Sequence, residues 1–157
     1  MRQQIFCIWS LYRIAHILKI HKVAGRILST GYEKFPSKEE IENILKKDTS
    51  IRAVAMVHHE TSTGRLNPLE LVGALAKKYK KLFIVDAISS LGAEKIDLNK
   101  NSIDYLCGTS GKCLHGFPGV SFVFISKTEA LKLGQNKPTS VYLDLANTLK
   151  LEEQNDT

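Results

Sequence analysis

Short apolar runs and capped helical segments alternate in the middle of the chain, and this alternation restricts the fold more than any other feature. Ala53–Val57 is an apolar run of strand length with polar residues on either side, and Leu82–Val85 is another. Such runs are typical of strands buried on both faces. Between them, the spacing predicts a helix with Asn67 as its N-cap, a proline at its first position and an end near Tyr79. The order strand, helix, strand predicts a right-handed parallel crossover and therefore an α/β fold.

Further elements of the same two kinds flank this crossover. Apolar residues at helical spacing predict helices over 11–20 and 37–47, and capping-box spacing predicts that another helix opens at Ser126. Third and fourth strands are predicted over 103–107 and 120–125. We therefore expect a partial, mainly parallel sheet flanked by helices.

The two ends of the chain carry weaker signals. The run Ile5–Tyr12 has no small-residue cleavage site after it and is far too short to span a bilayer, so no signal peptide or membrane anchor is predicted. We expect this run to be a helix or a disrupted terminus. The polar tail beyond Lys150 lacks a packing signal and is typical of an unfinished chain.

Composition and charge exclude several classes of protein. The net charge of +6 allows an anionic partner but selects none. The basic residues are dispersed except at Lys77–Lys81, where the series of aromatic residues that stacks on nucleic-acid bases is missing, so we expect a solvated helix end and no nucleic-acid partner. Three cysteines without a CxxC pair argue against a disulfide framework. A soluble, cytoplasmic protein with a single core is the expectation.

Polar side chains gather directly after three of the predicted strands, over 58–64, 86–90 and 109–112. In parallel α/β sheets, ligands bind beyond the carboxyl ends of the strands. Asp86 follows one strand, and Lys112 comes 26 residues later, at the same predicted edge. A carboxylate can keep a pyridine nitrogen protonated and a lysine amine can form an imine, which are the two groups that a pyridoxal cofactor needs. A lysine displaced from such an imine can also serve as a proton-transfer base.

Three strings of the sequence are specific enough to indicate a family. They read VHHETSTGRLNPL, IVDAISSLGA and SGKCLHGFPGVSFVF. Together they resemble the class V aminotransferases, which are pyridoxal-phosphate enzymes of fold type I. Within that class, the Lys112–Gly119 pattern and Leu66–Pro68 most resemble 2-aminoethylphosphonate:pyruvate transaminases, with alanine:glyoxylate and serine:pyruvate transaminases as the neighbouring match.

The resemblance implies a role for each matching position. Lys112 would hold pyridoxal 5'-phosphate as a Schiff base, and Asp86 would pair with the ring nitrogen. Thr61 would hydrogen-bond near the ring oxygen, and Ile88 would pack against a ring face. Just before the lysine, Ser110 and Gly111 stand where relatives contact the phosphate, and the glycine would offer only its backbone N–H.

The resemblance also implies what kind of protein this is. Residues 1–157 would form part of the large domain of such an enzyme, without the upstream phosphate-loop region and the C-terminal small domain, as in a truncated or frame-disrupted gene product. The implied activity moves an amino group from a small amine, 2-aminoethylphosphonate first, to pyruvate. An alanine or serine transaminase acting with glyoxylate or pyruvate, and a catalytically incomplete fragment, are the alternatives. Full-length relatives imply a homodimer.

Other polar clusters favour ordinary roles. His58, His59 and Glu60 are adjacent and lack the i, i+4 spacing of a chelating HExxH helix, so no metal site is predicted. We expect His58 in a satisfied polar pocket and Glu60 to orient a neighbour. Cys113 and His115 have no orienting third group, so a small buried cysteine is expected. No GxGxxG motif opens a strand-to-helix turn, which argues against a dinucleotide site.

Overall fold

The structure is a computed structural model that describes residues 4–8, 12–29, 31, 34–135, 138 and 140–155. The chain divides into two compact units, Met1–Phe124 and Ile125–Thr157. The first unit contains nearly the whole sheet and all of the predicted site residues. The second unit contains two helices, α4 (Lys127–Ala130) and α5 (Leu145–Asn155).

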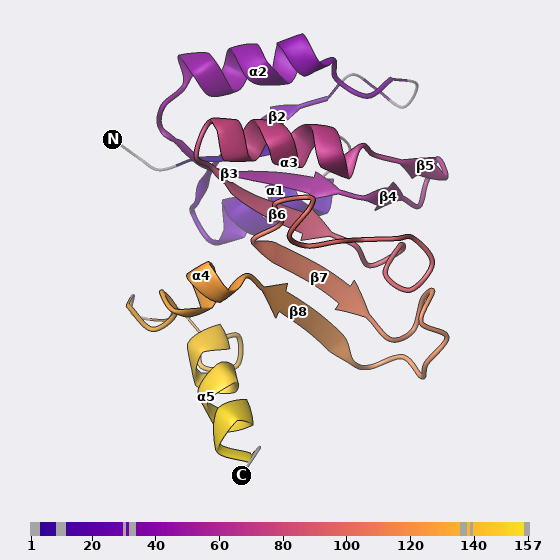
Figure 1. The fold of residues 1–157 in the computed structure, drawn as a ribbon, viewed down its shortest axis with the longest axis vertical. Helices are drawn as coiled ribbons and strands as arrows, with labels where there is room; N and C mark the ends of the chain where they lie inside the picture. The colour runs from indigo at the N-terminus through magenta and orange to yellow at the C-terminus, as the bar shows by residue number, and fades with distance from the viewer. Residues whose placement is uncertain are drawn as a thin grey trace. The chain divides into compact units, whose positions relative to one another are not determined.

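A six-stranded sheet in the order β2-β1-β3-β6-β7-β8 forms the centre of the fold (Figure 1). Its strands are β1 (Gln4–Ile8), β2 (Ala24–Leu28), β3 (Ile51–Val57), β6 (Leu82–Asp86), β7 (Tyr105–Thr109) and β8 (Ser121–Ile125). The pairings from β2 through β7 are parallel. Figure 1 shows the arrow of β8 running against that of β7. The predicted α/β fold with a mainly parallel sheet is confirmed.

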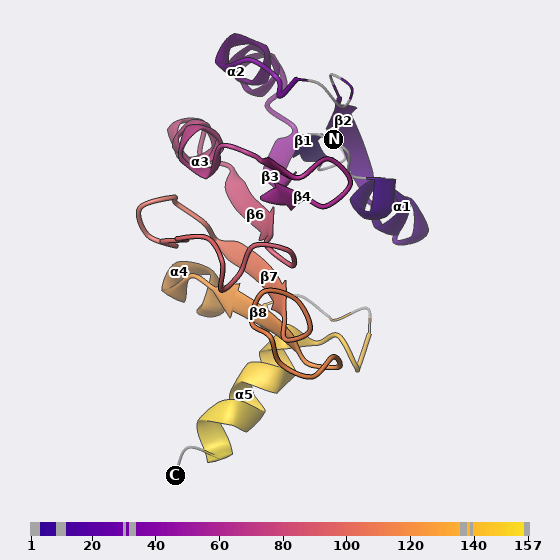
Figure 2. The same cartoon turned by 90° about the vertical axis from the view of Figure 1, so that its right-hand side faces the viewer.

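Three helices cover the two faces of this sheet. They are α1 (Tyr12–Ile20), α2 (Lys38–Lys47) and α3 (Leu69–Lys78). Figure 2 shows α2 and α3 together on one side of the strands and α1 on the other. A small antiparallel pair, β4 (His59–Glu60) and β5 (Arg65–Leu66), lies between β3 and α3 in the sequence.

The core has one cluster of buried side chains on each face. The larger cluster lies under α2 and α3 and includes Ile41, Val72 and Phe83, each with no exposed surface. The smaller one lies under α1 and includes Cys7 and Leu18. Because apolar residues of the inner strands face both clusters, these strands read as continuous apolar runs in the sequence.

The capping signals behave differently at two helices. At α2, Ser37 Oγ accepts from the backbone N–H of Glu40 at 3.2 Å, and Glu40 Oε2 accepts from the N–H of Ser37 at 2.7 Å, so the predicted capping box is confirmed. At α3, the predicted N-cap Asn67 is wrong, because Pro68 occupies that position without a side-chain cap. The side chain of Asn67 is 2% exposed and donates instead to the carbonyl of Val57 at 2.8 Å.

The basic segment at the end of α3 is only partly a solvated helix end. Lys77, Lys78 and Lys80 are exposed as expected, but Lys78 pairs with Glu42 of α2. Lys81 is half-buried and donates to the carbonyl of Ile51 at 2.6 Å. These contacts tie the end of α3 to α2 and to the start of β3.

Both ends of the chain differ from expectation. The described part of the run Ile5–Tyr12 is largely the strand β1, with residues 9–11 outside the described residues, so the expected helix is wrong there. Phe6, Cys7 and Ile8 are fully buried because β1 pairs with strands on both sides. The tail beyond Lys150, for which the sequence has no packing signal, continues the helix α5 as far as Asn155. Among the helices described, none combines the length and apolar character needed to cross a membrane.

Two other elements differ from the sequence prediction in position or in length. The strand expected over 103–107 is β7, two residues later, because Ile103 packs into the core from the turn before the strand. The helix predicted at Ser126 forms with its hydroxyl accepting from Glu129 N at 3.4 Å, but ends after four residues.

Candidate active site

The carboxyl ends of β3, β6 and β7 lie side by side, which brings the three polar clusters of the sequence to one edge of the sheet. Val57 pairs with Asp86, and Asp86 pairs with Cys107. The hydrogen-bond ladder continues past the strand ends, since His58 N donates to Asp86 O and Ala87 N donates to Cys107 O, each at 2.8 Å. The first residues after each strand are therefore held in register.

Ser89, in the turn after β6, links all three clusters. Its backbone carbonyl accepts from His59 Nδ1 at 2.8 Å and from the thiol of Cys113 at 3.4 Å. Its hydroxyl lies 2.8 Å from Thr61 Oγ1. Because Cys113 directly follows Lys112, these contacts bring the segments that carry Thr61 and Lys112 to the turn that Asp86 opens.

Asp86 is half-buried at the end of β6. Its Oδ1 accepts from the backbone N–H of Ile88 at 3.0 Å, an Asx-type contact that shapes the turn. Burial, with a smaller contribution from the Asp86 carboxylate, raises the pKa of the neighbouring Cys107 thiol. The side chain of Ile88 is 37% exposed, so an apolar surface remains available beside the carboxylate.

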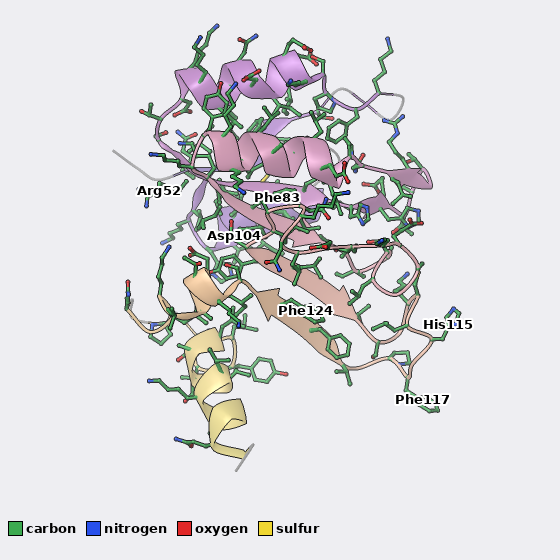
Figure 3. All side chains as sticks on the ribbon, viewed as in Figure 1. Arg52, Phe83, Asp104, His115, Phe117 and Phe124 are labelled. Atoms are coloured by element: carbon green, nitrogen blue, oxygen red, sulfur yellow. The ribbon has the colours of Figure 1, made fainter. Side chains whose placement is uncertain are left out.

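Lys112 lies in an exposed turn directly after β7. Its backbone carbonyl accepts from His115 N at 2.9 Å. His115 has a φ of 54°, and Figure 3 shows it with Phe117 at the outer end of this loop. Cys113, expected to be buried, is half-buried and makes its contact at the loop's inner side.

The loop that contains Lys112 is closed at its base by Ser110. The Ser110 hydroxyl donates to the carbonyl of Phe117 at 2.6 Å, and the Ser110 backbone N–H donates to that of Val120 at 3.0 Å. A Cβ at Gly111 would lie 3.1 Å from the Cα of Pro118, which is a tight contact. A glycine thus allows the two arms of the loop to approach closely just before the lysine.

His58 fills a polar pocket, as expected. It is 7% exposed, and its Nδ1 lies 2.9 Å from the hydroxyl of the buried Ser90. Burial lowers the pKa of His58, opposed by the charge of Glu94. Glu60 orients its neighbour Ser62 by accepting from its hydroxyl at 2.8 Å. Within the described ranges, no group of three His, Cys, Asp or Glu residues could hold a metal ion.

Sequence reasoning missed the two serines of the turn after β6 and the role of His59. Ser89 and Ser90 stood within a polar cluster that was predicted to carry function, but nothing in their spacing indicated partners about 30 residues earlier in the chain. Serines three and four residues after an aspartate that ends a strand are a usable signal, because short hydroxyl side chains commonly bond to nearby backbone groups.

The sequence profile of the family described as aminotransferase class-V matches residues 12–153 of this chain. The chain belongs to the class V aminotransferase family. Among curated proteins, the 2-aminoethylphosphonate–pyruvate transaminase of Lysinibacillus sphaericus is 42% identical over 133 residues, which are 85% of this chain and 36% of that protein. The corresponding transaminase of Vibrio cholerae is 38% identical over 143 residues, covering 91% of this chain and 39% of that protein.

Solved structures agree with this assignment to the class V aminotransferases. An alanine–glyoxylate aminotransferase from Nostoc sp. matches with a TM-score of 0.84 and 29% sequence identity, over 95% of this chain and 41% of that one. Structural neighbours of this kind are fold-type I pyridoxal-phosphate aminotransferases. The chain spans little more than a third of the length of the curated relatives it matches.

Class V aminotransferases depend on pyridoxal 5'-phosphate, and the donor set at the carboxyl edge fits that cofactor. The edge offers a half-buried carboxylate from Asp86, an exposed amine from Lys112, a hydroxyl from Thr61 and the apolar side chain of Ile88. These are the chemical groups that a protonated pyridine ring, an aldehyde, a ring oxygen and a ring face require.

Proposed function

We propose that this chain is the catalytic-centre portion of a pyridoxal-phosphate-dependent transaminase that moves an amino group from 2-aminoethylphosphonate to pyruvate. The observation that carries the proposal is the convergence at Ser89, which brings the Lys112 segment and Thr61 to the turn opened by Asp86. This arrangement supports a site in which a carboxylate and an amine from two strand ends of one sheet edge would bind the same small molecule.

Each residue has a task set by its chemistry. The Asp86 carboxylate would hold a proton on the ring nitrogen, and Lys112 would bind the cofactor covalently and then carry the proton at the α-carbon of the substrate. Thr61 would donate to the ring oxygen, Ile88 would pack on the ring, and Ser110 with the Gly111 N–H would lie toward the phosphate. The bound cofactor supplies the electron sink for the bond that breaks.

The donor is proposed from the relatives. Two proteins with 42% and 38% identity are named as 2-aminoethylphosphonate–pyruvate transaminases. The net charge of +6 is compatible with an anionic phosphonate. A transaminase that takes alanine or serine, with glyoxylate or pyruvate as acceptor, is the second candidate, favoured by the fold match to the Nostoc alanine–glyoxylate aminotransferase.

Cofactor binding is tested by adding pyridoxal 5'-phosphate to the purified chain, reducing with borohydride and locating the modified lysine by peptide mass spectrometry. We expect an imine absorption band and modification of Lys112. A Lys112→Ala variant should lose both, whereas Lys95→Ala, which removes another exposed lysine, should keep both. Modification spread equally over surface lysines would contradict the proposed cofactor site.

Activity is tested separately with 2-aminoethylphosphonate, alanine and serine as donors and pyruvate or glyoxylate as acceptor. Turnover that is highest with 2-aminoethylphosphonate is expected if the chain is competent. Cofactor binding without turnover of any donor would support the remaining alternative, a catalytically incomplete fragment. A homodimer and a cytoplasmic location stay predictions, the latter favoured by three free cysteines.

A further inference from the structure

We infer that Ser89 is a positioning residue that directs the proton of Thr61 toward the ring oxygen of the cofactor. The inference rests on the proposed function and adds to it a residue for which neither the family resemblance nor the strand pattern assigned a role. It follows from the number of protons that two adjacent hydroxyl groups possess and from the way in which Ser89 is held.

The backbone of Ser89 is fixed from two sides. A carbonyl oxygen only accepts hydrogen bonds, so His59 Nδ1 must donate to it across the 2.8 Å contact, and the Cys113 thiol donates to it at 3.4 Å. One donor comes from the segment after β3 and the other from the loop after β7. The position of the Ser89 hydroxyl is therefore set relative to both segments.

The two hydroxyl groups of Ser89 and Thr61 share one hydrogen bond, 2.8 Å long. Each hydroxyl has a single proton, so one of the two must donate and the other then has its own proton free. If Thr61 donated to Ser89, Thr61 could offer only lone pairs to the cofactor. If Ser89 donates to Thr61, the proton of Thr61 is free for an outside acceptor.

An anionic ring oxygen selects the second arrangement. It accepts hydrogen bonds only, and a chain of donors that ends on an anion is strengthened at each step by polarisation. The direction Ser89 to Thr61 to ring oxygen satisfies all three oxygens. No covalent bond is made or broken, and no proton leaves its own oxygen.

The test is a pH titration of the visible absorbance of the bound cofactor in the full chain. A donor at the ring oxygen stabilises the form in which the cofactor's linkage has lost its proton. Ser89→Ala keeps the backbone carbonyl and removes the hydroxyl, so the titration midpoint should rise by roughly half a unit to one unit. Ser89→Thr, which retains a hydroxyl, should restore the original midpoint.

Two controls separate positioning from a general structural effect. Ser62→Ala removes a hydroxyl of the same loop that bonds to Glu60, and its midpoint should equal that of the unsubstituted chain. In a Thr61→Val background, Ser89→Ala should cause no further shift, because the donor that it positions has gone. Should Ser89→Ala not fold, Ser89→Cys, a weak donor of similar size, has the same expected rise.

The outcomes are distinguishable. An unchanged midpoint in Ser89→Ala, or a full additional shift in the Thr61→Val background, overturns the role of Ser89 and leaves the proposed cofactor site standing. Failure of the unsubstituted chain to give any cofactor absorbance overturns the proposed function and this role together.

Discussion

At the carboxyl edge of the sheet, individual buried polar side chains hold the loops in place through hydrogen bonds to residues elsewhere in the sequence. His58 meets Ser90, 32 residues later, and the buried amide of Asn67 returns to the carbonyl of Val57. Removing one partner of such a pair leaves the other desolvated, which costs more than the bond contributes when intact. The loops that present Thr61 and Asp86 are therefore positioned by buried groups that are not among the proposed cofactor-binding residues.

His58 should make stability depend on pH. Its pKa in the folded chain is below the ordinary value of 6.5, mainly through burial, so the unfolded chain binds more protons in the window below that value. The contribution of neutral, buried His58 to the free energy of unfolding is fully present above pH 6.5 and is lost as the pH falls through the pKa of His58 in the folded chain. Urea denaturation at pH 7.5 and at pH 5.5, each about one unit from 6.5, measures this effect. Between these two pH values, we expect the unfolding free energy of His58→Asn to fall less than that of the parent chain.

A matched control for this measurement is His21→Asn, which removes an exposed histidine. Its pH profile should follow that of the parent chain. If His58→Asn and the parent lose equal stability over the same window, burial of His58 is not the source of the pH dependence.

At the residue scale, sequence reasoning identified side chains by type and place but not by partner. Asp86 and Lys112 were predicted from strand ends and the family resemblance, and the structure places both at the expected edge. Ser89 was not predicted, because the hydrogen bonds that its carbonyl accepts and its hydroxyl shares join segments that are distant in sequence. Asn67 was misassigned, since an asparagine before a proline satisfies the capping pattern whether it caps the helix or turns inward.

At the scale of elements, helices that have local sequence signals were predicted better than a strand that depends on tertiary packing. The helix α2 has its capping box at Ser37, and α3 follows the apolar spacing of its sequence. The edge strand β2 was missed because its middle residues are exposed and include Gly25 and Arg26, so it lacks both an apolar run and a clean alternation. Pairing with β1 makes it a strand, which is tertiary information.

The capping box of α2 should stabilise the chain measurably. Ser37→Ala removes the acceptor for Glu40 N, and we expect a loss of about 1 kcal/mol in unfolding free energy. Glu40→Ala should also be destabilising, whereas Glu40→Gln preserves an acceptor for Ser37 N and should stay close to the parent. Equal losses for Glu40→Ala and Glu40→Gln would mean that charge near the helix end, rather than the reciprocal bond, matters.

Gly73 of α3 lies close against the backbone of Asn101, in the turn before β7. A Cβ there would lie 1.9 Å from the backbone carbonyl oxygen of Asn101, a distance that only backbone movement can relieve. Although alanine is favoured over glycine within helices by about 1 kcal/mol, we expect Gly73→Ala to be strongly destabilising in thermal unfolding. Ala74→Gly, at the next and exposed position, should cost only about 1 kcal/mol.

On the scale of the whole molecule, large apolar side chains remain exposed along and beside β8. Phe117 is 92% exposed and Val120 53%, and on β8 itself Val123 and Phe124 are each 41% exposed. The strand lies at one end of the sheet order. Exposed apolar edge strands favour association with other chains.

We expect the purified chain to associate in a concentration-dependent way, observed by sedimentation velocity. Val123→Lys places a charge on an exposed apolar position of β8 and should shift the distribution toward the 17.6 kDa monomer. Ser121→Lys adds the same charge two residues away on the same face, where a polar side chain is already exposed. If both variants weaken association equally, net charge rather than apolar contact governs it.

The place of β1 inside the sheet has a consequence for synthesis on the ribosome. This strand emerges before both of its neighbours and can pair with β2 once residue 28 has followed, but its other side has no partner until β3 is complete at residue 57. During that interval, a mostly apolar strand with one open side is exposed in the nascent chain. Chaperone dependence during translation should therefore be greatest between these two lengths, and slower decoding there should lower the yield of native protein.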